Sequence, residues 1–270
     1  MDVSKSLKYV KTHGSLVEKA RLSAILMNEK PSSEVLEKLA LLQKPDGGFS
    51  FWVKDISNIT DTCYILEWFD DLKVYKGEVV DLACQYLLER QQIDGGWDEI
   101  SELVNYNPPE WMLPGKIETR VWLTAYCAHI LIRFSYAEAA GTKCPTDFLI
   151  ANSDHSGRLR GYLRATWLAL PMLAFYPGPD PDSFNRAVRV VEDNFSQDWK
   201  GSYIAWLLRC LKDAGIISGH PLVLRTISEL KRKQNIDGSW DPEEKEGDKH
   251  RINATILALR ALKEYNVYRL

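Results

Sequence analysis

This sequence of 270 residues lacks the features that would place it in a membrane or on nucleic acid. It contains no apolar run of about 20 residues, the length that a helix needs to cross a bilayer. Positive charge is not in excess, because 34 Lys and Arg residues stand against 37 Asp and Glu residues. The net charge of −3 gives no reason to expect a nucleic-acid partner.

Cysteine is also scarce. The five cysteines are odd in number and scattered, without the paired spacing of a zinc knuckle. This pattern is not that of a disulfide framework, so we expect a cytoplasmic protein. The first 14 residues contain no apolar segment, and we therefore expect no secretory signal peptide there.

Aromatic residues are plentiful instead, and one short sequence motif, called the phrase below, repeats. Three segments fit Gln-x-x-Asp-Gly-[Gly/Ser]-[Trp/Phe], beginning at Gln43, Gln91 and Gln234. The glutamines are 48 and 143 residues apart, and the second gap is close to three times the first. This spacing predicts a repeat architecture with two further copies whose phrase has been lost.

The segments around these phrases have helical periodicity. Segments 32–43, 76–91 and 221–234 are amphipathic, with apolar residues at steps of three and four. More apolar helices are expected at 15–26, 58–69, 118–134, 160–176, 202–215 and 250–265, with Pro171 kinking the fourth of them. A helix that is apolar nearly all round must be buried, and a helix with one apolar stripe covers it.

We therefore predict an all-α fold, an (α/α)6 toroid with six inner and six outer helices, formed by residues 1–270 as a single domain. An open α-solenoid is the structural alternative, although the chain shows no polar terminal caps of the solenoid kind. The repeated phrase is expected to end each outer helix in a turn. Its glutamine would bond the turn backbone or the start of the next helix.

The phrases resemble the QW repeats of the terpenoid cyclase and protein prenyltransferase superfamily, and YLLERQQIDGGW at residues 86–97 matches the full pattern. The resemblance is to a single-domain, squalene–hopene cyclase-like member. It implies an α/α toroid with a central cavity and chemistry at the N-terminal ends of the inner helices. Helix N-termini carry positive partial charge, which suits anions and tunes acids.

The resemblance points to the stretch 57–64. Class II cyclases carry Asp-x-Asp-Asp-Thr there, and the matching residues are Asn58, Ile59, Thr60, Asp61 and Thr62. The position of the proton-donating middle Asp is occupied by Thr60, so Asp61 is the candidate acid, assisted by Thr60 and Asn58. A carboxyl buried among aromatic rings has a raised pKa, as a proton donor needs.

Prenyltransferase β subunits offer a second match to the same stretch. They bind zinc through Asp-x-Cys followed by Tyr, and Asp61, Cys63 and Tyr64 fit that phrase. A third ligand would be His250, and the three side chains are a chemically reasonable zinc set. No metal or cofactor is favoured, and zinc or magnesium is kept as the alternative.

Two sets of residues are expected to contact the substrate. Arginines near the start of the fourth inner helix would hold an anionic head group, and they are Arg158, Arg160 and Arg164. Aromatic rings at helical spacing would line the cavity and stabilise carbocations, and they are Tyr64, Trp68, Trp122, Tyr126, Tyr162, Trp167 and Trp206. Aromatic walls with paired carboxylates also suit an (α/α)6 glycosidase, which the repeated phrases disfavour.

One insertion interrupts the pattern at about 98–116. It contains three prolines in the segment DEISELVNYNPPEWMLPGK and is too long for an ordinary connection. We expect a flap in which Trp111 and Met112 lie toward the cavity or a partner. The stretch PEWMLPG, at residues 109–115, is also the one candidate for peripheral membrane contact.

The sequence therefore predicts a terpenoid cyclase-like enzyme, a possible isomerase or lyase of class II, whose partner is an isoprenoid or another hydrophobic small molecule. A non-catalytic toroid that binds a lipid or a protein is the first alternative. A zinc-dependent chain resembling a prenyltransferase β subunit is the second.

Overall fold

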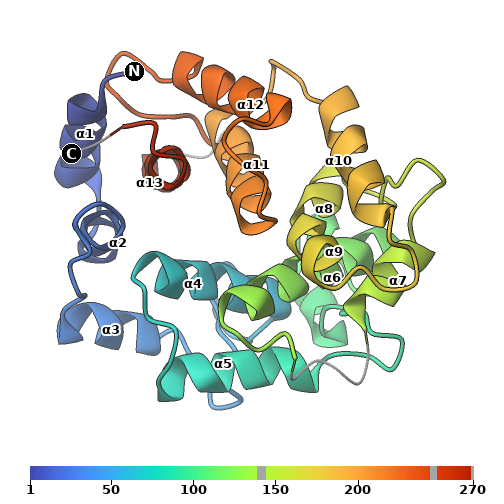
Figure 1. Cartoon of the computed structure of the whole chain (residues 1–270). Helices are drawn as coiled ribbons and strands as arrows, with labels where there is room; N and C mark the ends of the chain where they lie inside the picture. Colours follow the sequence, from blue (N-terminus) through green and yellow to red (C-terminus); the bar gives the residue numbers. More distant parts are fainter. Residues whose placement is uncertain (139–143, 244–247, 269–270) are drawn as a thin grey trace. The chain divides into compact units, whose positions relative to one another are not determined.

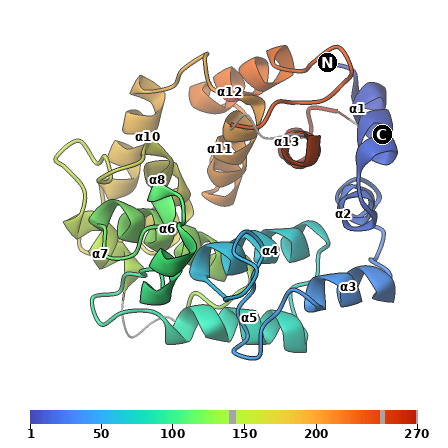
Figure 2. The same cartoon turned by 180° about the vertical axis from the view of Figure 1, so that it is seen from behind.

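The computed structural model describes residues 1–138, 144–243 and 248–268, and this part of the chain is helical without β-strands beyond isolated bridges (Figure 1, Figure 2). The helices, in chain order, are α1 (Val3–His13), α2 (Leu16–Met27), α3 (Ser33–Ala40), α4 (Ile59–Asp71), α5 (Glu78–Glu89), η1 (Ser101–Tyr106), η2 (Glu110–Met112), α6 (Ile117–Arg133), α7 (Pro145–Ala151), α8 (Leu163–Leu168), α9 (Leu170–Phe175), α10 (Ser183–Asp193), α11 (Gly201–Asp213), α12 (Pro221–Arg232) and α13 (Asp248–Glu264).

The helices group into two compact units. The first unit comprises residues 1–35 and 194–270, and in it α13 packs against α11, α1 and α2, while α12 packs against α11. The second unit comprises residues 36–193, and in it α6 contacts α4, α7, α8 and α9. Helix α5 lies against α4, and α10 lies against α8 and α9. The single domain over residues 1–270 stays a prediction.

The predicted alternation of amphipathic and apolar helices is present in the described residues. The pairs are α1 with α2, α3 with α4, α5 with α6, α7 with α8 and α9, α10 with α11, and α12 with α13. Helix α4 buries 11 of its 13 residues and α6 buries 12 of 17, whereas α5 buries 5 of 12. The more apolar member of the pair is therefore the more buried one, as its composition requires.

Pro171 interrupts the fourth apolar segment, as expected. Helix α8 ends at Leu168, and α9 begins at Leu170 after a single turn residue, Ala169. Pro171 has no backbone N–H to donate, and its ring clashes with the preceding turn, so a regular helix is disfavoured here. The preceding outer helix, α7, starts with Pro145 at its first position, where a missing N–H costs nothing.

The repeated glutamine bonds its own turn and a neighbouring outer helix. Gln43 Nε2 donates to the carbonyl oxygen of Gly47 at 2.8 Å and to that of Val79, in the first turn of α5, at 2.7 Å. Gln234 Nε2 donates to the carbonyl oxygen of Asp2 at 2.9 Å, and its Oε1 accepts from the backbone N–H of Asp2 at 2.7 Å. The phrase thus joins consecutive helix pairs, the structural role expected from its sequence.

The aromatic residue of the phrase is anchored by two hydrogen bonds. The indole N–H of Trp97 donates to Leu87 O at 2.7 Å, and its backbone N–H donates to Thr124 Oγ1 on the next apolar helix at 2.9 Å. The same backbone-to-hydroxyl bond recurs between Phe49 and Thr62, and between Trp240 and Thr255. A threonine in the apolar helix is therefore part of the repeat.

A fourth copy of this turn lies at 153–159, in the interval where the spacing predicts copies whose phrase has been lost. Asp154 N donates to Arg158 O at 2.9 Å and Gly157 N donates to Asp154 O at 3.0 Å, as the corresponding residues do in the other copies. Leu159 N then bonds Thr166 Oγ1 at 3.1 Å. Gly157 has φ +89°, and the equivalent glycines of the three full phrases have φ of +86° to +92°. Ser153 and Leu159 stand where the other copies have glutamine and an aromatic residue.

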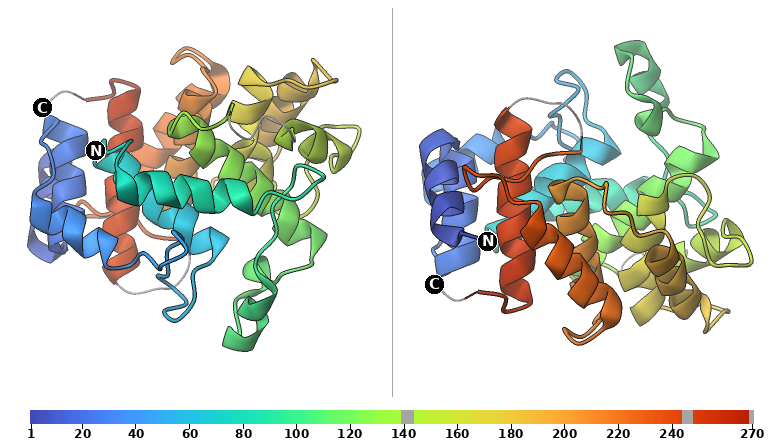
Figure 3. Two further views of the ribbon diagram at one scale, coloured as in Figure 1. Left: turned by 90° about the horizontal axis from the view of Figure 1, so that it is seen from below. Right: turned by 90° about the horizontal axis from the view of Figure 1, so that it is seen from above.

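The insertion at 98–116 contains the two 3₁₀ helices, η1 and η2, and extends from the same side of the second unit as the loop before α4 (Figure 3). Leu103 and Met112 are buried in it. Gly115 N donates to the carboxylate of Asp98 at 3.0 Å and 3.1 Å, which closes the base of the insertion. None of the helices in the described residues is long and apolar enough to cross a membrane.

Candidate functional site

Helix α4 begins with a dense set of buried polar side chains. Asn58 caps the helix, and its Oδ1 accepts a hydrogen bond from Asp61 N at 2.8 Å. Thr62 Oγ1 donates to Asn58 O at 2.7 Å. Asn58, Asp61 and Thr62 are each 0% exposed, and Thr60 is 3% exposed. The positive end of the helix dipole makes this turn a favourable place for a carboxylate.

The two carboxyl oxygens of Asp61 have different environments. Oδ2 accepts from the backbone N–H groups of Phe51, Trp52 and Val53 at 2.7, 3.0 and 3.3 Å, and from Asn58 Nδ2 at 2.8 Å. Oδ1 is buried and has no hydrogen-bond partner in the described part of the chain. Burial raises the pKa of Asp61, and the hydrogen bonds to Oδ2 partly oppose that effect. When Asp61 is neutral, Oδ1 is the oxygen that can carry the proton.

A second buried carboxyl, Glu99, lies at the same helix start and was not found from the sequence. Its Oε2 accepts from Ile59 N at 3.0 Å, and its Oε1 accepts from Thr60 N at 2.9 Å and from Thr60 Oγ1 at 2.5 Å. Glu99 is 5% exposed. Burial raises its pKa to about 7, against the effect of these hydrogen bonds, and the charge of Asp61 raises it further. Its one sequence signal is an acid two residues after Trp97.

Aromatic rings gather on the Asp61 side of α4. Tyr64 and Trp68 follow Asp61 by three and seven residues, so all three share a helix face. The rings of Tyr64 and Trp68 are 5.4 Å apart between centroids, and Phe51 lies 5.3 Å and 5.2 Å from them. Trp52 packs on Phe51 at 5.0 Å. The structure therefore brings two predicted substrate-binding rings together and adds two from the loop.

A second aromatic group lies on α6. Trp122 and Tyr126 are 5.5 Å apart, and Trp111 of the insertion packs edge-on against Trp122 at 5.3 Å. The guanidinium of Arg164 lies 5.9 Å from the Trp122 ring and 5.6 Å from the Tyr162 ring. Trp122 Nε1 is buried without a hydrogen-bond partner in the described residues. A cation thus stands beside this group of rings.

The two remaining predicted rings lie on other helices. Trp167, on α8, is 0% exposed and belongs to the core of the second unit. Trp206 lies on α11, in the first unit.

The proposed zinc ligands are engaged elsewhere or lie apart in the chain. Cys63 Sγ is 3.7 Å from Cys127 Sγ on α6, and burial raises the pKa of the Cys63 thiol well above its usual value. His250 lies in the first turn of α13, in the first unit, whereas Asp61 and Cys63 are in the second. Among the residues described, no three His, Cys, Asp or Glu side chains form a group that would hold a metal ion. The geometry lends no support to zinc or magnesium.

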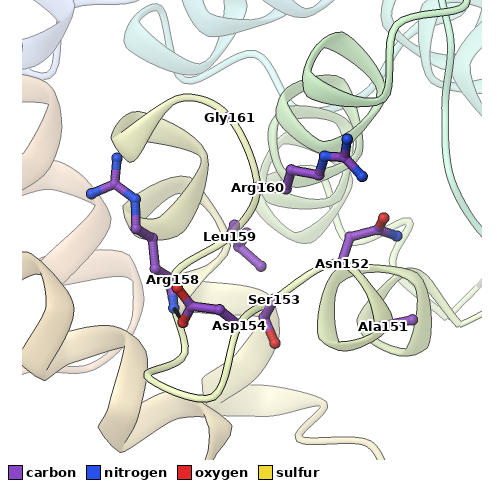
Figure 4. A pocket seen from close by; sticks show the side chains of 8 residues that line it. All are labelled: Ala151, Asn152, Ser153, Asp154, Arg158, Leu159, Arg160 and Gly161. Atoms are coloured by element: carbon purple, nitrogen blue, oxygen red, sulfur yellow. Dashed lines mark hydrogen bonds between the residues drawn. The ribbon is translucent and has the colours of Figure 1, made fainter.

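The three arginines do not form one group. Arg158 and Arg160 border a cavity of about 380 Å³ at the fourth copy of the turn, whereas Arg164 lies by Trp122. The side chains of Arg158 and Arg160 point in different directions from the loop (Figure 4). Arg160 Nε is 3.4 Å from Glu118 Oε1. Leu159, which stands where the other copies have an aromatic residue, is one of the residues that line this cavity.

The fold and the site can now be compared with known proteins. A family model described as the A-macroglobulin TED domain matches residues 4–148, more than half of the chain. The chain belongs to the A-macroglobulin TED domain family. No curated protein matches its sequence.

Solved structures extend the comparison beyond the part of the chain that the TED family model matches. A protein from Actinoplanes has a TM-score of 0.63 and 16% identity, over 97% of this chain and 98% of that chain. The type II terpene cyclase MstE from Scytonema has a TM-score of 0.60 and 17% identity, over 92% of this chain and 87% of that chain. A variant of that cyclase in complex with geranylgeranyl dihydroxybenzoate has a TM-score of 0.58 and 19% identity, over 93% and 86%.

These identities show the fold alone. This member of the TED domain family has the all-α fold of the α/α toroid class that terpenoid cyclases share, and the fold class predicted from the sequence is confirmed. The roles of individual site residues rest on the geometry around α4 and α6.

Proposed function

We propose that this TED-family chain binds an isoprenoid against the aromatic side chains of α4 and α6, and that Asp61 starts its cyclisation as an acid. The observation that carries the proposal is Asp61 Oδ1, an oxygen that is buried and has no hydrogen-bond partner in the described residues. It belongs to a helix face that also bears Tyr64 and Trp68.

In the proposed step, the O–H bond at Asp61 Oδ1 breaks and its proton goes to one carbon of the terminal double bond of the isoprenoid. The π electrons form the new C–H bond, and the other carbon becomes a cation. Double bonds further along the chain attack that cation and close rings, and loss of a proton gives a neutral isomer. The quadrupoles of the Tyr64, Trp68 and Trp122 rings stabilise the positive charge.

Asn58 and Thr60 orient the acid. Asn58 bonds both the backbone N–H and Oδ2 of Asp61, so that Oδ2 is held and Oδ1 remains for the proton. Thr60 bonds Glu99 through its hydroxyl and its backbone N–H. An anionic end of the substrate would lie by Arg164, and Arg158 and Arg160 stay candidates for the same role.

The insertion at 98–116 contributes to substrate entry. Trp111 packs on Trp122 and Met112 is 0% exposed, so these two side chains lie inward. Val104 and Tyr106 of η1 are 55% and 42% exposed, and they are the apolar side chains of the insertion that could touch a membrane surface. Such contact would let an isoprenoid pass directly from a bilayer.

The second candidate is a non-catalytic chain that binds a lipid or a protein. Two observations favour it: Thr60 stands where cyclases have their acid, and the four hydrogen bonds to Asp61 Oδ2 give that residue a structural role. Both hypotheses require the aromatic groups of α4 and α6.

The test is turnover of geranylgeranyl substrates, chosen because a solved neighbour was determined with geranylgeranyl dihydroxybenzoate. We expect the wild type to form a cyclic product and Asp61→Asn to be at least about 100-fold slower. Asp55→Asn, at an exposed aspartate of the same loop, is the matched control and should retain wild-type rates. Equal turnover by wild type and Asp61→Asn would remove the acid. Binding by the wild type without turnover would establish the non-catalytic alternative.

A further inference from the structure

We propose that Glu99 is a positioning residue for Asp61: it holds the first turn of α4 from outside the helix, and the charges of the two carboxyl groups are coupled. This inference rests on the proposed function and deepens it. Asp61 would contact the substrate, whereas Glu99 would act through Asp61.

The first support is the way in which Glu99 completes the helix start. Asn58 satisfies the backbone N–H of Asp61, which leaves the N–H groups of Ile59 and Thr60 without an intrahelical acceptor. Glu99 takes both of them, one with each oxygen, at 3.0 Å and 2.9 Å. The backbone that carries Asp61 is therefore fixed by a side chain from the segment that follows Trp97.

The second support is the position that Glu99 reaches. The resemblance to class II cyclases aligns Thr60 with the proton-donating Asp, and Thr60 is not an acid. Glu99 Oε1 lies 2.5 Å from Thr60 Oγ1, so a carboxyl group from another part of the chain lies beside the hydroxyl at that position. The chain thus retains two acids at the start of α4, although only Asp61 remains within the motif.

The third support is charge. No lysine or arginine forms an ion pair with Asp61 or Glu99 in the described part of the chain. Cys63 of α4 and Tyr86 of α5 also interact electrostatically with Glu99, and burial raises the pKa of both of them as well.

Farther groups complete the surroundings. Cys63 also interacts with Glu67 of α4 and with Cys127 of α6, while Asp98, the chain neighbour of Glu99, lies 4.0 Å from Arg120 Nε. In the described residues, therefore, no ion pair offsets the charge of either carboxyl. Two carboxylates without an ion-pair partner repel each other in a buried site. The first proton that the pair binds is therefore held more tightly than a proton on either group alone.

The direct test is a carboxyl titration by infrared difference spectroscopy, in wild type, Glu99→Gln and Asp61→Asn. The proposal expects the protonated-carboxyl band of Asp61 to persist to higher pH in wild type than in Glu99→Gln, by about one pH unit. Glu102→Gln, an exposed acid of η1, is the control and should titrate like wild type. If Glu99→Gln does not fold, Asp61→Asn gives the reciprocal result, a lower pKa for Glu99.

Turnover adds a second measurement. An acid must be protonated to act, so the high-pH limb of kcat should move about one pH unit lower in Glu99→Gln, with KM nearly unchanged. If Glu99 only caps the helix, Glu99→Gln will lower the free energy of unfolding but will change neither the infrared titration of Asp61 nor the high-pH limb of kcat. That result would overturn the inference. If wild type shows no turnover, the proposed function fails and the infrared titration alone decides whether the two carboxyls are coupled.

Discussion

Replacement of Glu99 by Gln should change the pH dependence of folding stability. Burial raises the pKa of Glu99 to about 7 from its ordinary value of 4.5. The folded protein therefore binds a proton here that the unfolded chain releases at lower pH. The free energy that corresponds to this gap is about 3 kcal/mol, at about 1.4 kcal/mol for each pH unit.

The sign follows from the raised pKa. The contribution of Glu99 to stability is fully present below pH 4.5 and is lost as the pH rises to about 7, because the folded state must then bury a charge that the unfolded state exposes. Glutamine does not titrate. The free energy of unfolding of Glu99→Gln, relative to wild type, should therefore rise by about 3 kcal/mol between about pH 4.5 and about pH 8.

Urea unfolding at a series of pH values measures this difference. Glu37→Gln, at an exposed glutamate of α3, is the matched control, and its free energy of unfolding should vary with pH in parallel with that of wild type. The same parallel behaviour in Glu99→Gln would refute the reasoning, because it would mean that Glu99 has an ordinary pKa in the folded protein. A slope in the opposite direction would mean that its hydrogen bonds outweigh its burial.

The remaining predictions concern the repeats and the thiols. Gly48→Ala would place a Cβ 2.4 Å from the Tyr86 ring and should cost about 2 kcal/mol of unfolding free energy, whereas Gly219→Ala, with nothing within 4 Å, should change it little. Trp97→Phe removes an indole N–H that donates to a backbone carbonyl at 2.7 Å and should cost about 1–2 kcal/mol in urea unfolding. A thiol reagent at mildly alkaline pH should label exposed Cys144 in the native protein and the four buried cysteines only after unfolding.

The repeats could be predicted because their sequence signal is local. Gln43, Gln91 and Gln234 are followed by the same turn residues, and helical periodicity fills the intervals, so that the helix pairs follow. A copy between Gln91 and Gln234 was expected from the spacing, but the turn at 153–159 could not be located, because its backbone hydrogen bonds are retained while the side chains that mark the phrase are not. A turn is fixed by backbone geometry, which Ser153 and Leu159 allow as well as glutamine and tryptophan do.

The candidate site was predictable in part. Asp61 was found because its motif is contiguous, and its pairing with Tyr64 and Trp68 follows from helical spacing. Glu99 was missed because its partners are 39 and 40 residues earlier, so that only the packing of α4 against the following segment brings them together. The sequence also did not reveal that Arg164 is separated from the cavity at Arg158. The arginines are close in sequence, but a glycine turn at Gly161 and the start of α8 lie between them.

The most direct test of the account is the mass of the product formed from a geranylgeranyl substrate in deuterium oxide. If Asp61 donates an exchangeable proton to the terminal double bond, the wild type should give a cyclic product that carries one deuterium. Asp61→Asn should form this product at least about 100-fold more slowly. A cyclic product without deuterium, or one that Asp61→Asn forms as fast as wild type, would contradict the claim that this buried carboxyl starts the reaction.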